Sequence, residues 1–286
     1  MASHLERIVY VNGEFLPGSE ARISIFDRGF LFADAVYEGL GVRNGKIIDF
    51  SMHVARLKRS LGELNIPEPF DDVELKTVLE HLVSVNRITE GFAYLHVTRG
   101  EGERDYLYEP GLRPSVIAFV QSSGEKHENI EENGISMSSQ RDLRWKRRDI
   151  KTSNLLGQVI AKNAASNAGT YEALLVDDNG NITEGGATSF FIVKDRAIIA
   201  RPVTHEILHG ITRQTMLKVA EHLSMEITEQ IFTLQEAYSA DEAFITGASS
   251  YIQPVVQIDG MNIGDGKPGP VTLQLRKSYL EFCDSF

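Results

Sequence analysis

The sequence lacks the features that mark secreted, membrane-spanning and nucleic-acid-binding proteins. Cys283 is its only cysteine, so no internal disulfide can form and nothing points to an oxidising compartment. No apolar run approaches the roughly 18 residues of a membrane span, and Met1–Arg7 opens no signal-peptide core. The net charge of -11 argues against binding to a phosphate backbone. We therefore expect a cytoplasmic protein with no membrane or nucleic-acid partner.

The composition that remains is that of a globular protein, with 42% apolar and 24% charged residues and no internal repeat. A chain of 286 residues is long enough for two domains of ordinary size. Residues 123–134 are polar and nearly without apolar side chains, which favours a linker. The sequence thus predicts a smaller α+β domain at 1–122 and a larger one at 135–286.

Strand and helix patterns alternate in both halves. Asn12-Gly13 and Asn44-Gly45 are hairpin-turn signals. Apolar residues recur at helical spacing behind Ser51, which is a candidate cap, and behind Asp71-Asp72. The other expected strands are 92–97, 116–120, 173–176, 190–193, 197–200 and 243–245, and the other expected helices are 160–168 and one opening at Gly210.

Lys151 and Glu184 are the residues that most strongly suggest a chemistry. A solvated lysine is the common alternative, but Ile150, Leu155 and Leu156 give Lys151 an apolar setting, and burial favours the neutral amine that attacks an aldehyde. Glu184 lies among small residues that would let a flat ring approach. An imine-forming lysine and a carboxylate beside a ring nitrogen are the groups that pyridoxal 5′-phosphate (PLP) requires. The pair therefore predicts a PLP enzyme.

A phosphate group would find donors at two loops. Gly210-Ile211-Thr212 stands at an expected helix start, where free amides and the helix dipole favour an anion. Thr246–Ser250 follows an expected strand and is rich in small donors. Arg56 is a candidate source of positive charge, although an arginine at helical spacing is often simply solvated.

The segment His205–His209 matches the zinc-hydrolase pattern His-Glu-x-x-His. That pattern needs a continuous helix to place both imidazoles on one face, and here Pro202 and Gly210 enclose it closely. Nothing in the sequence selects a third ligand. We expect no metal site and keep the zinc hydrolase as the weaker alternative.

Taken together, these segments resemble the fold-type IV PLP enzymes, which include D-amino acid, branched-chain and (R)-amine transaminases. The resemblance runs from about Val9 to Gln257 and its elements occur in family order. They are Tyr10–Gly13, Asp27–Phe30, Asp34–Glu38, His53–Leu57, Thr98–Gly100, Asp149–Thr152, Thr183–Gly185 and Gly210–Arg213. The resemblance implies the two-domain α+β fold of D-amino acid aminotransferases, PLP as the cofactor and a homodimer.

The resemblance also implies roles for the residues around the cofactor ring. Lys151 would form the imine with PLP and move the proton between the substrate carbon and the cofactor. Glu184 would hold the pyridine nitrogen, and Leu208 would lie against the ring.

For the phosphate, the resemblance implies Arg56, the main-chain amides of Ile211 and Thr212, and the Thr212 hydroxyl. One position departs from the family pattern. Ala248 stands where a threonine hydroxyl commonly reaches the phosphate, so Ser249 or main-chain amides would have to substitute.

Within the family, the sequence is most similar to the D-amino acid branch. Leu156 replaces a tyrosine of the branched-chain enzymes, and Gly41 replaces an arginine. Tyr37, Arg104 and Tyr106 fall where D-amino acid enzymes place a tyrosine, an arginine and a histidine that bind the substrate carboxylate. A guanidinium suits that task because it forms a two-pronged hydrogen bond with a carboxylate. Tyr106 departs from the family histidine.

We expect a transaminase that moves the amino group of a D-amino acid, such as D-alanine, to a 2-oxo acid, such as 2-oxoglutarate, by a ping-pong mechanism. An (R)-amine transaminase and a branched-chain L-amino acid aminotransferase remain open alternatives. An aminodeoxychorismate-type lyase of the same fold is a further one, and it would release pyruvate without an amino acceptor.

Overall fold

The computed structural model describes residues 4–123 and 129–285, which form two compact units. Unit 1 contains the described residues up to 123 together with Ile150–Asn154, and unit 2 contains residues 129–149 and 155–285. Of the linker predicted at 123–134, residues 124–128 lie outside the described residues, and the rest includes the short helix α4 (Ile130–Asn133). The domain boundaries 1–122 and 135–286 remain a prediction.

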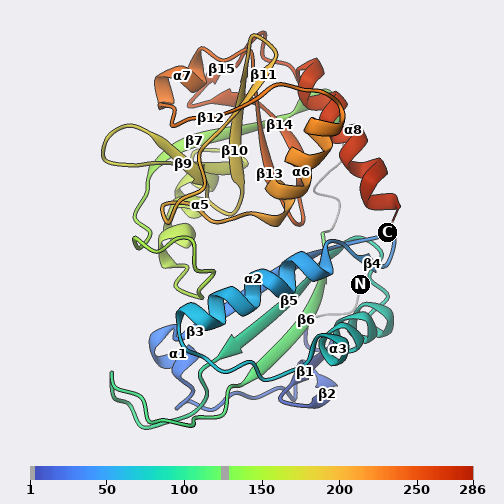
Figure 1. Cartoon of the computed structure of the whole chain (residues 1–286), viewed down its shortest axis with the longest axis vertical. Coiled ribbons are helices and arrows are strands. Elements are labelled where there is room, and N and C mark those ends of the chain that lie inside the picture. Colours follow the sequence, from blue (N-terminus) through green and yellow to red (C-terminus); the bar gives the residue numbers. More distant parts are fainter. Residues whose placement is uncertain (1–3, 124–128, 286) are drawn as a thin grey trace. The chain divides into compact units, whose positions relative to one another are not determined.

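Unit 1 is built on an antiparallel sheet in the order β2-β1-β6-β5-β3-β4 (Figure 1). Its strands are β1 (Ile8–Val11), β2 (Glu14–Pro17), β3 (Ala35–Arg43), β4 (Lys46–Ile47), β5 (Gly91–Thr98) and β6 (Val116–Ser122), and its helices are α1 (Arg28–Phe32), α2 (Phe50–Glu63) and α3 (Asp72–Val85). Helix α2 packs on β3, and α3 packs on β1 and β6. Alternation along β3 buries Val36 and Leu40 while the intervening Tyr37 and Gly39 stay partly exposed.

The turns of unit 1 follow the local sequence signals. Both residues of Asn12-Gly13 and of Asn44-Gly45 have positive φ, as the tight turns of two-residue hairpins require. Helix α3 begins as predicted, because the Asp71 carboxylate accepts a hydrogen bond from the main chain at Glu74. The prediction of a cap at Ser51 was wrong, since α2 already begins at Phe50.

Unit 2 is built on a nine-stranded mixed sheet whose main path is β12-β11-β10-β13-β14-β7-β8-β9. Its strands are β7 (Ile135–Arg141), β8 (Glu172–Val176), β9 (Ile182–Gly185), β10 (Ser189–Lys194), β11 (Ala197–Ala200), β12 (Ile227–Glu229), β13 (Glu242–Gly247), β14 (Tyr251–Ile258) and β15 (Met261–Asn262). Besides α4, its helices are α5 (Leu156–Asn167), α6 (Ile211–His222), α7 (Leu234–Tyr238) and α8 (Pro270–Asp284). The neighbouring strands β8 and β9 pair antiparallel, as do β10 and β11.

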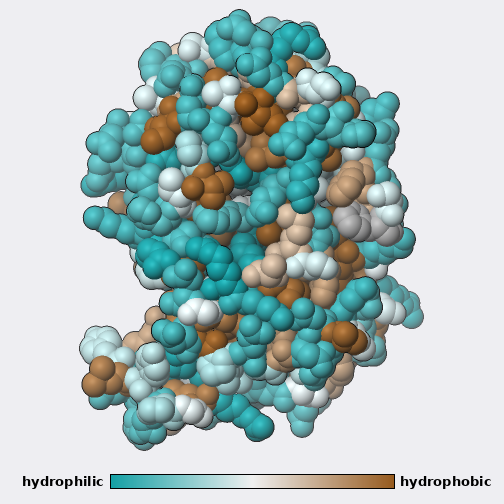
Figure 2. All heavy atoms as spheres, in the orientation of Figure 1, coloured by the Kyte–Doolittle hydropathy of each residue, from teal (hydrophilic) through white to brown (hydrophobic). Residues whose placement is uncertain are grey.

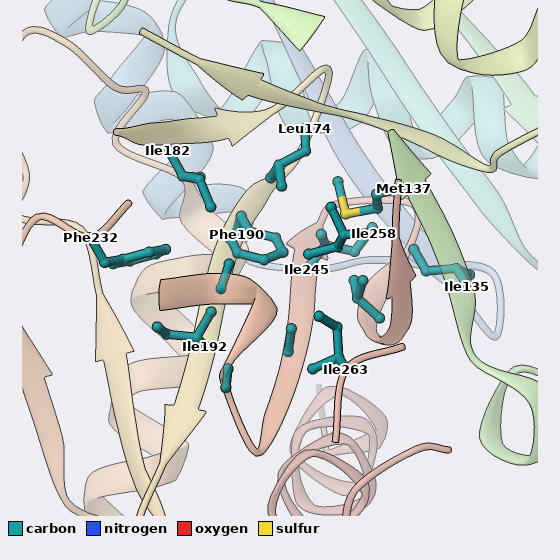
Figure 3. Close-up of a cluster of buried hydrophobic side chains, with 14 residues drawn as sticks. Ile135, Met137, Leu174, Ile182, Phe190, Ile192, Phe232, Ile245, Ile258 and Ile263 are labelled. Atoms are coloured by element: carbon teal, nitrogen blue, oxygen red, sulfur yellow. The ribbon is translucent and has the colours of Figure 1, made fainter. Parts of the chain in front are cut away.

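The core of unit 2 lies on one face of this sheet (Figure 3). Phe190, Ile192 and Ile245 pack there with Leu174, Phe232 and other apolar side chains. Alternation turns Phe191 to the opposite face, where its ring stacks on that of Phe244 at 4.8 Å. Helices α6 and α8 pack against β13.

Helix α5 is four residues longer at its start than the predicted 160–168 segment, because it begins at Leu156. The residue at its N-cap position is Leu155, which makes no side-chain cap bond, so no capping residue at that position signalled the start. Among the helices of residues 4–123 and 129–285, none has the length and apolarity to span a membrane.

Candidate active site

Lys151 lies in the segment Ile150–Asn154, which runs along β3 within unit 1. The Tyr37 N–H donates to the Lys151 carbonyl at 2.9 Å, and the Lys151 N–H donates to Ser60 Oγ at 3.3 Å. The Lys151 side-chain nitrogen lies 4.2 Å from the centroid of the Tyr37 ring. These hydrogen bonds thus fix the main chain at Lys151, and its amine lies over the aromatic face of Tyr37.

The apolar setting predicted for Lys151 is only partly present. Ile150 is buried, but Leu156 is 67% exposed because it opens helix α5 in unit 2.

The three residues predicted to bind a substrate carboxylate divide into two groups within unit 1. Tyr37 stacks on Tyr94, with ring centroids 5.4 Å apart. Arg104 and Tyr106 both lie beside Phe32, at 5.6 Å from its ring centroid in each case. Tyr106 is 79% exposed. The joint role of the three residues in binding a carboxylate remains a prediction.

Arg56 is held by the buried Glu38, which also contacts the buried His53, and neither residue was given a role from the sequence. Its guanidinium donates to both oxygens of Glu38, at 2.8 and 2.7 Å, and Glu38 also contacts His53 Nδ1 at 2.7 Å. Burial favours the neutral form of Glu38, but Arg56 outweighs it and lowers the pKa of this carboxyl to about 2. Glu38 is therefore ionised at neutral pH and orients Arg56 on α2. The available signal was the i, i+3 spacing of His53 and Arg56 on one helix face.

Glu184 is buried in unit 2 and belongs to an ion-pair network centred on Arg144. Arg144 donates to Glu184 Oε2 at 2.6 Å and to both oxygens of Asp142, at 3.0 and 2.8 Å. The Thr183 hydroxyl donates to the same Asp142 at 2.7 Å, and the Leu208 main-chain N–H donates to Glu184. Arg144 and Asp142 were not predicted from the sequence, since the pairing of Arg144 with Glu184 spans forty residues of chain.

Burial raises the pKa of the Glu184 carboxyl, and the adjacent Arg144 guanidinium opposes that shift. Burial also works against ionisation of Asp142, but hydrogen bonds and charge from Arg144 lower its pKa overall. The pKa of Arg144 itself is raised: burial favours its neutral form, and the charges of Glu184 and Asp142 outweigh that effect. Arg144 therefore stays cationic and favours the ionised form of Glu184.

The start of helix α6 offers donors to an anion. Ile211 and Thr212 are its first two residues, both are buried, and the described residues supply no side-chain cap to the helix. Gly210 precedes them, and a Cβ at this position would lie 2.9 Å from Ser189 Oγ. Glycine thus leaves the helix start open, with uncapped amides and the positive end of the helix dipole.

The buried residues Ser189 and Thr246 lie on neighbouring strands, and Ser189 is close to this helix start. Thr246 pairs with Ser189 across β13 and β10, so the two side chains share one face of the sheet. Thr246 is 2% exposed, and its Oγ1, like that of Thr188, has no hydrogen-bond partner among the described residues. Ala248 and Ser249 lie in the β13–β14 turn, as the strand prediction implied. Strand β13 therefore supplies an unused hydroxyl despite the alanine at 248.

The zinc-hydrolase alternative fails on local structure. His205–His209 is a turn rather than a helix, so the spacing does not place two imidazoles on one face. Glu206, the would-be general base, pairs with Arg201 at 2.7 Å. Within residues 4–123 and 129–285, no group of three or more metal-ligating side chains is assembled.

Comparison with known proteins identifies the family. The family model described as "Amino-transferase class IV" matches residues 35–258. The chain belongs to this family. The match spans every predicted site residue, from Tyr37 to Ser249, so the recognition of the family from the sequence is confirmed.

The relatives and solved structures of this class IV aminotransferase agree over nearly the whole chain. It is 40% identical to the D-alanine aminotransferase of Bacillus licheniformis, over 92% of this chain and 93% of that one. It is 37% identical to the Staphylococcus haemolyticus D-alanine aminotransferase, over 97% and 98%.

Among solved structures, the Escherichia coli branched-chain amino acid aminotransferase gives a TM-score of 0.89 at 25% identity, covering 96% of this chain and 94% of that one. The T.th. branched-chain amino acid aminotransferase with pyridoxamine 5′-phosphate gives 0.87 at 28% identity, over 96% and 93%. The predicted α+β fold class is confirmed.

Proposed function

We propose that this class IV aminotransferase is a PLP-dependent enzyme that transfers the amino group of D-alanine, or a similar D-amino acid, to a 2-oxo acid such as 2-oxoglutarate. The observation that carries the proposal is the 40% identity to a D-alanine aminotransferase over 92% of the chain. One cofactor takes the amino group from the donor and then passes it to the acceptor, so the kinetics are ping-pong.

Each unit, taken by itself, carries residues that suit a part of PLP. Lys151 offers an amine beside an aromatic face for the aldehyde. Glu184, whose ionised form the paired Arg144 favours, offers a carboxylate to the pyridine nitrogen. Ile211, Thr212 and Arg56 offer donors to the phosphate, and Leu208 a side chain to the ring. Bound PLP supplies an electron sink for the carbanion at the substrate carbon, and Lys151 moves the proton to and from that carbon.

The decisive experiment is a half-reaction titration of the purified holoenzyme without an amino acceptor. D-alanine is expected to bleach the visible absorbance of the enzyme rapidly, whereas L-leucine leaves it unchanged and (R)-1-phenylethylamine bleaches it at a much lower rate at equal concentration. Bleaching by L-leucine alone would instead assign the branched-chain function, and catalytic release of pyruvate from aminodeoxychorismate would assign the lyase function.

The substrate carboxylate is assigned to Arg104, together with Tyr37 and Tyr106. The variant Arg104→Ala is expected to lower kcat/KM for D-alanine by about 10- to 100-fold, because a hydrogen bond to a charged group is worth about 1.5–3 kcal/mol. Any residual rate with (R)-1-phenylethylamine, which has no carboxylate, should not change. Equal losses for both donors would contradict the assignment.

Thr246 is proposed as the hydroxyl that contacts the phosphate in place of the family threonine at 248. Thr246→Val is expected to weaken PLP binding by about tenfold, since it deletes one hydrogen bond to an anion without changing side-chain shape. The dissociation constant of PLP from the apoenzyme measures this directly. Thr272→Val is the matched control, because its hydroxyl is also buried and without a partner among the described residues but lies in the first turn of α8. Equal dissociation constants for the two variants would refute the role of Thr246.

The homodimer and the cytoplasmic location implied by the sequence remain proposals. Ile25, Phe30 and Leu107 are 68%, 73% and 82% exposed in unit 1, and apolar atoms reach the surface at the tip of the loop after β5 (Figure 2). We propose that a second copy of the chain covers these side chains in the dimer. Light scattering on the purified protein tests the dimer, and cell fractionation tests the location.

A further inference from the structure

The loop between β5 and β6 carries Arg104 and Tyr106 on its outside, yet a buried side chain holds its main chain. Arg28 Nη1 donates to the Asp105 carbonyl at 2.7 Å, and Nη2 donates to the Tyr106 carbonyl at 3.3 Å. These two carbonyls directly follow Arg104 in the chain. One guanidinium therefore fixes the backbone next to the predicted carboxylate-binding residue.

Arg28 is itself fixed from its other side. It is 3% exposed, and its Nε donates to Asp34 at 2.9 Å. Arg99 donates to both oxygens of Asp34, at 2.7 and 3.0 Å, and also to the carbonyls of Leu64 and Asn65. The carboxylate of Asp34 thus ties the arginine under the loop to the end of α2.

Aromatic contacts complete the attachment of the loop. The Arg28 guanidinium lies 4.7 Å from the Phe32 ring centroid and 5.7 Å from that of Tyr108. Arg99 lies over the same Tyr108 ring at 3.8 Å. Stacking of a guanidinium on an aromatic face is attractive and restricts both groups. Tyr108 therefore anchors the loop four residues after Arg104. The contacts of Arg28 with the Asp105 and Tyr106 carbonyls anchor it directly after Arg104.

The short helix that carries Arg28 has its own buried support. The Asp27 carboxylate accepts from the Gly29 N–H at 2.8 Å and from the hydroxyls of Thr98 and Ser115 at 2.9 and 2.7 Å. Thr98 and Ser115 stand at the two ends of the loop, and the Arg28 N–H donates to the Gly100 carbonyl. The base of the loop and the start of α1 are joined through one carboxylate.

From these contacts we infer that Arg28 is a positioning residue: by holding the Asp105 and Tyr106 carbonyls it fixes Arg104, and so favours amino donors that carry a carboxylate over amines that do not. This inference rests on the proposed function, because Arg104 must meet the carboxylate. Lysine cannot replace Arg28, since one ammonium lacks the planar fork that reaches two carbonyls and Asp34 together.

A double-mutant cycle tests the inference. Arg28→Lys is expected to lower kcat/KM for D-alanine about tenfold, mainly through KM, and to leave any rate with (R)-1-phenylethylamine unchanged. In the Arg104→Ala background the same change should have no further effect, because the residue through which it acts is gone. Equal factors in both backgrounds, or equal losses for both donors, would overturn the inference.

The matched control is Arg22→Lys. Arg22 is exposed and also donates to two carbonyls, those of Ser19 and Ala21, at 2.7 and 2.8 Å. Hydrogen exchange of residues 103–109 should quicken in Arg28→Lys and stay unchanged in Arg22→Lys. Unchanged exchange in both would also overturn the inference.

The test also separates a failure of this inference from a failure of the proposed function. If Arg28→Lys does not fold, Tyr108→Leu removes the stacking contact on the same loop and enters the same cycle with the same expectation. If Arg104→Ala leaves D-alanine kinetics unchanged, the carboxylate assignment under the proposed function fails and this inference fails with it. A large Arg104→Ala effect with additive Arg28→Lys overturns only the role of Arg28.

Discussion

Replacing Lys151 with alanine is expected to stop turnover and to abolish the visible absorbance of the holoenzyme. Under the proposed function the amine is both the covalent attachment of PLP and the base at the substrate carbon, and a general base alone contributes about 10²- to 10⁴-fold. We therefore expect kcat to fall by at least about 10³-fold. The main-chain contacts of residue 151 do not involve its side chain, so the fold should persist. Borohydride reduction of the wild type followed by peptide mapping should find PLP attached at Lys151.

Lys194→Ala is the control for this experiment. Lys194 is a half-exposed lysine in unit 2 that pairs with Asp241 at 3.1 Å, so its loss should change neither absorbance nor turnover. A Lys151→Ala protein that remained coloured and active would refute the central assignment.

Replacing Arg144 with glutamine is expected to have the largest effect on stability. Both carboxylates that it pairs with, Asp142 and Glu184, are buried, and removal of one partner of a buried ion pair costs about 3–5 kcal/mol. Urea unfolding should show this as a lower midpoint at constant slope. Arg141→Gln is the control, because Arg141 forms an ion pair of similar length with Asp178 on the exposed surface.

The same variant should change the pH dependence of activity. Without the guanidinium, only the hydrogen bond from the Leu208 main chain still opposes burial, so the pKa of Glu184 rises further above its usual range. A carboxyl is protonated below its pKa, so Arg144→Gln should lose activity at neutral pH and regain it as the pH rises. Arg144→Lys retains the charge and should keep a profile near that of the wild type. A glutamine variant with an unshifted profile would show that Arg144 does not control the charge on Glu184.

The elements that were predictable are those whose signals are local. Asn12-Gly13 and Asn44-Gly45 specify their turns through the positive φ that these residues tolerate. Asp71 caps its helix through a bond three residues away. The start of α2 was missed because its N-cap, Asp49, adopts a left-handed conformation and makes no side-chain cap bond, leaving Ser51 as the more familiar signal.

The active-site residues divide in the same way. Lys151, Glu184 and Arg56 were singled out from the sequence by their neighbours and the family resemblance. The residues that pair with Glu184 and Arg56 were not. Arg144 pairs with Glu184 on β9, forty positions later in the chain. Glu38 on β3 pairs with Arg56 on α2, eighteen positions later. Pairings of this kind depend on strand order and helix placement, which no local pattern encodes.

The placement of Ile150–Asn154 within unit 1 bears on how the enzyme is made. This segment completes the edge of β3, where it accepts the hydrogen bond of Tyr37, but it follows a strand of unit 2 in the chain. During synthesis, β3 therefore emerges long before the segment that covers its edge, and unit 1 must wait for β7 to leave the ribosome before its own structure is finished. A fragment that ends before residue 150 would keep the sheet of unit 1 but expose that edge, and it would lack Lys151, the lysine proposed to bind PLP.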